Sequence, residues 1–242
     1  MKQDSRELAE VRNAATLAVP RENLYAGIHK ALRALLSDTL TAVGRMDAHD
    51  ALELAQTMQR MLQMLDLMRS HLQHENAFVH PAMEACAPGS SEAIGEDHEG
   101  HVAEIEALAG QGRALLDTDA AQRDAAAHAL YQRLALFVAH NFEHMHVEET
   151  RHNEVLWANY SDAELIALHG ALVASIAPEE MMQVMRWMVP FMNPGERAGL
   201  LGGMQMHAPA PAFAAVLAVA RPHLDAREWE KLAAALALAP AA

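Results

Sequence analysis

The sequence predicts an all-α fold, an antiparallel up-down four-helix bundle followed by an extension of shorter helices. Hydrophobic residues make up 52% of the 242 residues, but aromatic residues only 5%. The excess is Ala, Leu and Met, which favour helices, and runs of β-branched residues are scarce. A chain of this length can bury one good core, or one core with a smaller appendage.

Capping and breaking residues mark four long helices. Asp50 with Glu53 resembles a capping pair at the start of the second helix, which weakens at Pro81 because proline lacks an N–H. The sequence "APGSS" at 87–91 is a clear break before the third. We expect the four helices to occupy residues 20–45, 51–80, 92–116 and 119–157. Short connections between them favour antiparallel neighbours.

The predicted organisation has three parts: an N-terminal segment at 1–20, the bundle at 21–159 and the extension at 160–242. Further helix starts are expected in the extension at Ser161, Pro178, Asn193 and Asp225, each followed by glutamate in the first turn. The sequence "LLGGM" at 200–204 is interpreted as a helix break. The extension either caps the open end of the bundle or supplies the interface of a homodimer.

Four methionines in the extension repeat at helical spacing: Met181, Met185, Met188 and Met192. A stripe of this kind is typical of core packing, which is the favoured interpretation. The alternative is a groove that adapts to a partner, because methionine surfaces tolerate varied ligands.

Composition excludes several classes of function. The formal net charge of −14 argues against a nucleic-acid partner, which requires clustered Lys and Arg. Cys86 is the only cysteine, so the chain has neither a disulfide framework nor a CxxC motif. The first residues lack a secretory signal, and no apolar run approaches the roughly 18–20 residues of a membrane span. We therefore expect a cytoplasmic protein without a membrane partner.

Histidine and glutamate are concentrated in two stretches, residues 69–81 and 137–152. Residues four apart on a helix lie about 40° apart on one face. His71 therefore points the same way as Glu75, and His144 the same way as Glu148. These two pairs predict that the second and fourth helices face each other.

The first and third helices each carry one buried-looking histidine, His29 and His98. The offset from His29 to His71 is 42 residues, and that from His98 to His144 is 46. This weak repeat predicts two helix pairs, each supplying His plus His-x-x-x-Glu, related by a pseudo-twofold axis.

The mixture of ligands favours a pair of iron ions. A carboxylate can bridge two cations, and neutral imidazoles can complete each coordination shell. Several histidines with two glutamates exceed the four ligands that a single zinc ion commonly takes. Without a metal, two buried carboxylates would be strongly destabilising. The candidate ligands are His29, His71, His74, Glu75, His98, His101, His144 and Glu148.

A fifth histidine ligand remains open among His74, His101 and His140. His74 lies within the arc of His71 and Glu75, and His101 is near His98. We expect three others, His80, His146 and His152, at the surface or at helix ends, because an α-helix turns them away from the ligand face. Tyr25, one turn before His29, is expected in the core, with a place in the metal pocket as the alternative.

The local sequences "HENAFVHP" and "EHMHVEE" are similar to signatures of the hemerythrin-like (HHE cation-binding) family, and the resemblance covers roughly residues 22–157. It implies a four-helix bundle with a non-haem di-iron site, bridged by two carboxylates and usually an oxo or hydroxo group. Members reversibly bind dioxygen, sense oxygen or iron, or handle iron and nitric oxide under stress.

Two departures from the best-known members bear on function. Val102 stands where they have a histidine four after His98, and the fourth helix has His144-x-x-x-Glu148 in place of His-x-x-x-x-Asp. The latter spacing resembles the iron-sensing and repair branches. We expect binding or sensing of dioxygen or a related diatomic. One alternative is a redox enzyme or stress-response protein acting on peroxide or nitric oxide, or donating iron for repair. Another is a helical interaction protein with adventitious zinc or no metal.

Overall fold

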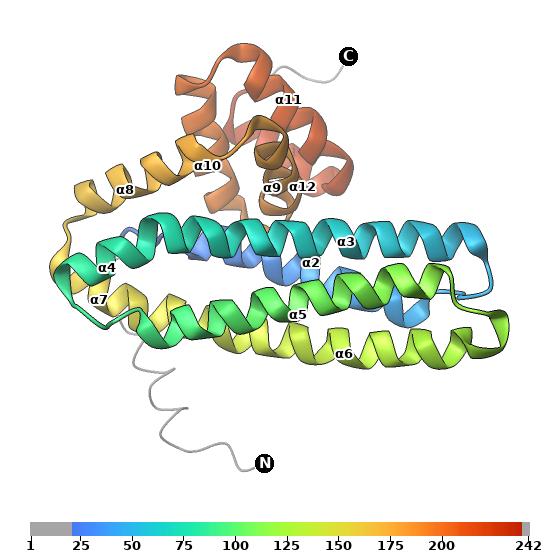
Figure 1. Ribbon diagram of the computed structural model, residues 1–242. Helices are drawn as coiled ribbons and strands as arrows, with labels where there is room; N and C mark the ends of the chain where they lie inside the picture. The colour runs from blue at the N-terminus through green and yellow to red at the C-terminus, as the bar shows by residue number, and fades with distance from the viewer. Residues whose placement is uncertain (1–20, 239–242) are drawn as a thin grey trace, which may run out of the picture.

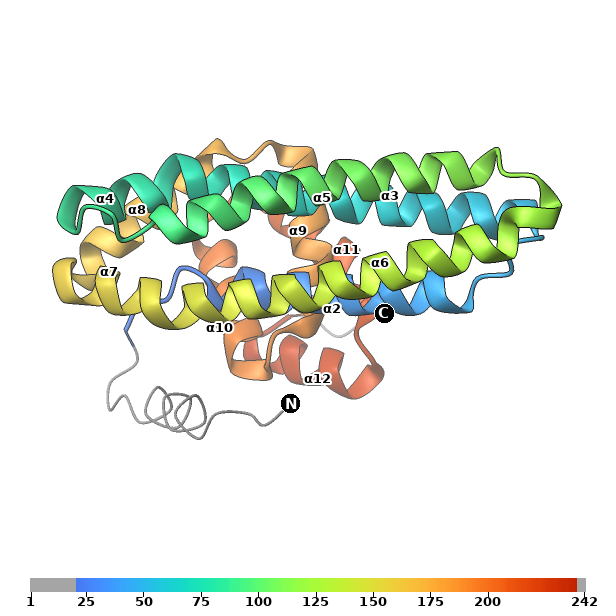
Figure 2. The same ribbon diagram turned by 60° about the horizontal axis from the view of Figure 1, so that its bottom comes forward.

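The computed structural model describes residues 21–238, in which every regular element is a helix (Figure 1). The expected N-terminal segment at 1–20 lies outside the described residues, as do residues 239–242. Four long helices run side by side: α2 (Ala26–Arg45), α3 (Ala51–His74), α5 (Glu92–Leu116) and α6 (Ala120–Val147). α2 and α5 each pack against both α3 and α6, and successive helices are antiparallel (Figures 1 and 2). The predicted bundle is confirmed.

Local capping explains where the first two bundle helices begin. The Asp50 carboxylate accepts hydrogen bonds from the amides of Leu52 and Glu53, as the sequence predicted. α2 begins at Ala26, later than expected from Pro20. The side-chain oxygen of Asn23 accepts hydrogen bonds from the amides of Tyr25 and Ala26, at 3.0 and 3.1 Å, and so satisfies the free amides at that point.

Two π-helical turns interrupt the bundle helices at equivalent places. η1 (Glu75–Val79) joins α3 to α4 (His80–Cys86), and η2 (Glu148–His152) joins α6 to α7 (Asn153–Asn159). The weakening expected at His80-Pro81 corresponds to this interruption, but the chain stays helical through both residues. Pro81 occupies the first turn of α4, directly after the wider π-turn, where a missing N–H is tolerated.

The bundle core consists mainly of leucine and methionine. Its fully buried members include Leu32, Met61, Leu108 and Leu134, one from each long helix. Gly112 on α5 leaves room for the side chain of Met61 on α3, since a Cβ atom at Gly112 would lie 2.4 Å from Cε of Met61. The absence of a side chain at Gly112 therefore sets how closely α5 packs on α3.

The extension contains α8 (Asp162–Ser175), α9 (Pro178–Phe191), α10 (Pro194–His207), α11 (Ala210–Ala220), the 3₁₀ turn η3 (Arg221–His223) and α12 (Ala226–Ala235). These helices stack on one side of the bundle, where α9 packs against α2 (Figure 1). Val184 of α9 belongs to the bundle core, and its neighbour Met185 belongs to a second core formed by the extension. α9 therefore joins the two cores.

The predicted helix starts of the extension are confirmed. Ser161, Asn193 and Asp225 each form a complete capping box with the glutamate three residues later. The break predicted at "LLGGM" is wrong, because α10 continues through both glycines. A Cβ atom at Gly202 would lie 3.7 Å from Leu236, so the glycine faces the end of α12 inside a packed interface. Tertiary packing here outweighs the low helix propensity of glycine.

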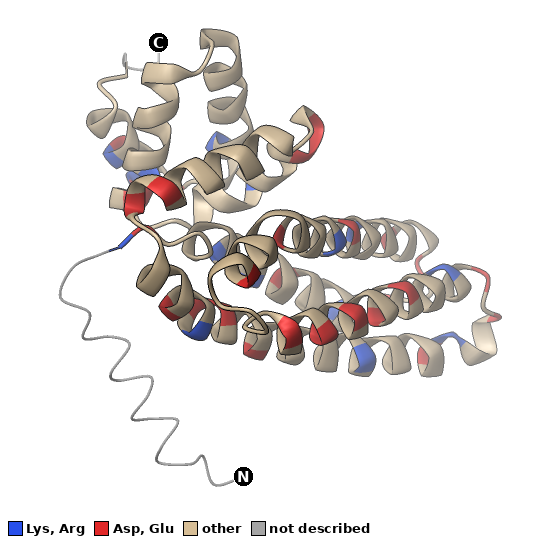
Figure 3. Ribbon diagram, turned by 60° about the vertical axis from the view of Figure 1, so that its left-hand side comes forward, with Lys and Arg blue, Asp and Glu red and all other residues tan. Residues whose placement is uncertain are grey.

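Within residues 21–238, no single helix has the length and apolar composition needed to cross a membrane. α8 and α9 meet that criterion only as a pair, bent by 118°. Acidic residues are distributed over the helices of the bundle, with basic residues interspersed (Figure 3). This distribution agrees with the net charge of −14.

Replacement of Gly112 by valine tests the close packing of α5 on α3. We expect Gly112→Val to lower the free energy of unfolding by about 1–3 kcal/mol, because the new side chain overlaps the buried Met61. Gly110, on the same helix with nothing within 4 Å, is the matched control. Gly110→Val should change stability by less than about 0.5 kcal/mol. Equal losses in urea denaturation of the two variants would contradict this account.

Candidate metal centre

Six of the predicted ligands lie together inside the bundle, and all are buried. They form two groups that share both glutamates. One contains His29 and His71, from α2 and α3, and the other contains His98 and His144, from α5 and α6. Within each group the potential ligand atoms all lie within 4.8 Å of one another. The arrangement has the pseudo-twofold form expected from the repeat.

Each glutamate directs a different oxygen atom toward each histidine pair. Oε1 of Glu75 lies 3.2 Å from Nε2 of His71 and 3.7 Å from Nε2 of His29, whereas Oε2 lies 3.7 Å from Nε2 of His98. Oε1 of Glu148 lies 3.2 Å from Nε2 of His144 and 3.6 Å from Nε2 of His98, whereas Oε2 lies 3.5 Å from Nε2 of His29. A carboxylate in this position can bridge two cations.

The polar atoms at the centre lack hydrogen-bond partners. All four oxygens of Glu75 and Glu148 are buried without one, as are the Nε2 atoms of His29 and His71. The Nε2 atoms of His98 and His144 lie 3.1 Å apart, so they can form a hydrogen bond only while one of them keeps a proton that a metal would displace. Buried polar atoms are normally paired, so this set of nitrogen and oxygen donors fits metal cations.

The two carboxylates have opposite electrostatic surroundings. Burial, together with the charge of Glu148, raises the pKa of Glu75 to about 8. Burial also acts to raise the pKa of Glu148, but the nearby imidazoles of His144 and His98, at 3.2 and 3.6 Å, outweigh it and hold that pKa well below its usual range. Without a cation the two carboxylates share the pocket by retaining a proton on Glu75 at neutral pH.

The two histidines of the first group also differ. Burial lowers the pKa of His29, but the hydrogen bond with Glu149 and the nearby carboxylate of Glu75 outweigh it and raise the pKa to about 9. Burial and the neighbouring charge of His29 hold the pKa of His71 well below its usual range. A metal must therefore displace a proton from His29, whereas His71 already offers a free lone pair.

Two further residues orient ligand histidines, and the sequence reasoning missed both. Nδ1 of His98 lies 2.7 Å from Oδ1 of Asn76, and Nδ1 of His29 lies 3.1 Å from Oε1 of Glu149. Arg33 holds Glu149 in turn through two hydrogen bonds, of 2.6 and 3.0 Å. An acceptor at Nδ1 places the proton there and leaves Nε2 free to bind a metal. Asn76 and Glu149 each directly follow one of the two glutamates that both groups share, which is the signal that could have found them.

His80 and His152 are buried, at 8% and 3% exposure, so a position at the surface is wrong, although His80 begins α4 and His152 ends η2, as the alternative of helix ends had it. In an uninterrupted α-helix, His80 would lie about 180° from His71 and His152 about 80° from His144. The extra residue of each π-turn reduces these angles by about 100°, which turns both rings toward the site. His146, expected at the surface, is exposed.

His80 and His152 form a third group of potential ligand atoms with Glu148. Burial and neighbouring histidines lower the pKa values of both to about 4, so both are neutral at neutral pH. The hydroxyl of Tyr25 lies 3.2 Å from Nδ1 of His152. Burial and the two glutamates raise the pKa of Tyr25 well above its usual value, so its hydroxyl keeps its proton and can donate it to His152 when Nδ1 of that ring is unprotonated. Tyr25 thus contacts the site as well as the core.

Three other histidines considered from the sequence lie around this centre. His101 is buried with its ring 4.8 Å from that of His144, and its Nδ1 has no partner. His74 is half-buried and points toward the extension, with Nδ1 3.8 Å from the Glu180 carboxylate. His140 is exposed. The structure brings none of the three into the groups that contain Glu75 and Glu148.

The family model of the hemerythrin HHE cation-binding domain matches residues 23–152, more than half of the chain, so the protein belongs to this family. The match covers the bundle and both π-turns and ends at His152. Searches of curated proteins and of solved structures find no match. The protein is therefore an all-helical member of a cation-binding family, with buried His and Glu groups suited to metal cations.

Metal binding should release protons, because His29 and Glu75 have pKa values of about 9 and 8 without metal. Both groups hold protons at pH 7, and a cation must replace them. We expect the release of about two protons per chain at pH 7 and an affinity that falls as the pH is lowered. Calorimetry in buffers of different ionisation enthalpy measures the number. Release of no protons at pH 7 would contradict the assignment.

Substitution of Asn76 tests the orientation of His98. Asn76→Leu removes the acceptor at 2.7 Å from Nδ1 and should weaken metal binding by about 10–100-fold. Gln73→Leu, at an exposed position one turn earlier, is the control and should leave the affinity unchanged. Competition with a chromophoric chelator measures both values. The same affinity in the two variants would show that Asn76 does not position a ligand.

Proposed function

We propose that the bundle holds two non-haem iron ions bridged by Glu75 and Glu148, and that the site binds or senses dioxygen or a related diatomic. The observation that carries this proposal is the separation of the carboxylate oxygens. Each glutamate offers one oxygen to the His29–His71 pair and the other to the His98–His144 pair. Ferrous ions at these positions would supply the electrons and open coordination positions that a diatomic needs.

The charge of the site suits two divalent cations that remain reactive. The neutral histidines contribute no charge, and Glu75 and Glu148 together supply two negative charges once the proton of Glu75 has left. Two of the four positive charges would remain for an exogenous or bridging anion. His80 and His152 stay neutral and lie against Glu148, so either imidazole is available to complete the shell.

The surroundings favour an uncharged small ligand. A cavity with mainly apolar walls adjoins His71 and Glu75. Dioxygen and nitric oxide enter such a space more readily than ions do. The same walls limit the access of water, which supports reversible binding.

A redox enzyme is the second candidate, and the contact between Tyr25 and His152 favours it. The Tyr25 hydroxyl keeps its proton and lies 3.2 Å from a histidine of the Glu148 group. A proton donor beside an open coordination position is what reduction of peroxide or nitric oxide requires. Tyr25→Phe removes this donor while keeping the ring.

The absorption spectrum and the iron content of the iron-loaded protein together test the proposal. We expect about two irons per chain and oxo-to-iron charge-transfer bands on exposure of the reduced protein to air. Glu148→Gln should lose the bands and about one iron, because the bridge is broken. Glu143→Gln, at an exposed position on α6 just before η2, should retain both. An iron content near zero, with thermal stability unchanged by a chelator, would favour the structural alternative.

Removal of oxygen and a turnover assay separate carrier from enzyme. Return of the reduced spectrum under vacuum would indicate reversible binding. Steady-state consumption of peroxide or nitric oxide, lowered at least about tenfold by Tyr25→Phe, would indicate the enzyme. Absence of turnover in the iron-loaded wild-type protein would contradict the hypothesis that it is an enzyme.

A further inference from the structure

A cavity of about 410 Å³ lies between the bundle and the extension. One wall comes from α2, α3 and η1 and includes His71 and Glu75. The opposite wall comes from α8, α9 and α10. The cavity therefore reaches from the candidate metal centre to helices that lie outside the family match.

The wall from the extension is almost wholly apolar. Three of the four methionines singled out in the sequence, Met181, Met188 and Met192, are half-buried there, while Met185 also belongs to the second core. Further apolar members include Leu168, Leu172, Ile176, Val184, Leu200 and Met204. Thioether side chains adapt to ligands of different shape. The stripe thus combines both interpretations, core packing and an adaptable surface.

The charges of the wall select against ionic ligands. The ionisable residues that line the cavity are Tyr25, three histidines and two glutamates, with neither Lys nor Arg. Glu180 is already engaged, at 2.5 Å from the Ser70 hydroxyl and 3.8 Å from Nδ1 of His74. A ligand carboxylate or phosphate would find no cationic side chain here, so an uncharged molecule fits best.

The volume is larger than a diatomic needs. An apolar cavity of about 150 Å³ suffices for benzene, and sites for small organic molecules commonly occupy about 300–1,000 Å³. Folded proteins rarely contain large empty spaces, because packing is close throughout their interiors. A cavity of 410 Å³ at this position is therefore of the size of a ligand site.

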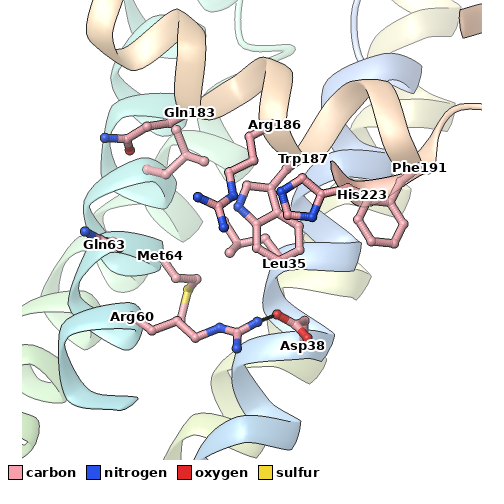
Figure 4. A pocket seen from close by; sticks show the side chains of 11 residues that line it. Leu35, Asp38, Arg60, Gln63, Met64, Gln183, Arg186, Trp187, Phe191 and His223 are labelled. Atoms are coloured by element: carbon pink, nitrogen blue, oxygen red, sulfur yellow. Dashed lines mark ion pairs between the residues drawn. The ribbon is translucent and has the colours of Figure 1, made fainter. Parts of the chain in front are cut away.

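A second hollow nearby has charged walls and so differs in character from the apolar cavity. It lies on the other face of α9 and is lined by Arg60, Arg186 and Gln183, among others, with Arg60 paired to Asp38 (Figure 4). That hollow contains none of the candidate metal ligands. Since the two spaces share α9, residues of this helix provide matched variants.

We propose that the cavity between the bundle and the extension binds an uncharged, largely apolar organic molecule with one end against His71 and Glu75. The methionine wall holds its apolar body. This proposal deepens the proposed function by adding a second ligand beside the metal centre, but the cavity itself does not require that the metals be iron.

Fluorescence titration with the neutral probe N-phenyl-1-naphthylamine tests the cavity. We expect saturable binding of one probe per chain, to metal-free and zinc-loaded protein alike. Leu172→Trp and Met188→Trp each place an indole in the cavity from different helices and should weaken binding by about tenfold or more. Gln183→Trp, exposed on α9 and facing the other hollow, should bind as the wild type does.

Thermal melts establish that each variant is folded, and the use of two helices keeps the test valid if one variant is not. Unchanged binding in the folded cavity variants would overturn the proposal and place the probe on the surface. Equal weakening by Gln183→Trp would do the same.

Paramagnetic relaxation then locates the probe. In cobalt-loaded protein its proton resonances should broaden strongly, and in zinc-loaded protein they should not, because the cavity wall includes His71 and Glu75. Equal line widths would overturn the contact with the metal centre. If the protein binds no metal but still binds the probe, and Leu172→Trp weakens that binding, the proposed function is contradicted. The proposal of a ligand site in the cavity would still hold.

Discussion

Two carboxylates buried in one pocket are the constraint on which the rest of the site depends. Glu75 is 3% exposed and Glu148 is not exposed, and every ion-pair partner recorded for them in residues 21–238 is a histidine. Each isolated buried charge would be destabilising by several kcal/mol. Protons offset this in part when no cation is present, which explains why the pKa of Glu75 is raised to about 8. Cations compensate both charges at once, so folding and metal binding are coupled.

The histidines are held in place by a second set of contacts that repeats the symmetry of the first. The residue after each of the two shared glutamates accepts a hydrogen bond from the first histidine of the opposite helix pair: Asn76 from His98, and Glu149 from His29. The two acceptors differ in charge, because Glu149 also pairs with Arg33. The repeat is therefore symmetric in position but not in electrostatics, which distinguishes the two groups of potential ligands.

The sequence predicted those parts of the site that follow from local helical geometry. Spacing of four residues gave His71 with Glu75 and His144 with Glu148, and capping pairs gave the starts of α3, α8, α10 and α12. His80 and His152 were missed because a change of backbone hydrogen-bond register has no residue signature of its own. The orientation of His74 depends on Glu180 of α9, and the sequence of α9 does not indicate which face of the bundle this helix packs against. The cavity was likewise beyond prediction, since it arises from contacts between residues far apart in the chain.

The two π-turns also affect how relatives of this chain should be aligned. His80 follows its glutamate by five residues and His152 follows by four, yet both rings reach the same group. A sequence motif that requires one fixed interval between the glutamate and the histidine would miss either His80 or His152. In a homologue whose helix lacks the additional residue, the equivalent imidazole would have to stand at a different interval. Relatives should therefore be aligned by superposing their backbones beyond the π-turns. A sequence alignment alone would pair the wrong residues there.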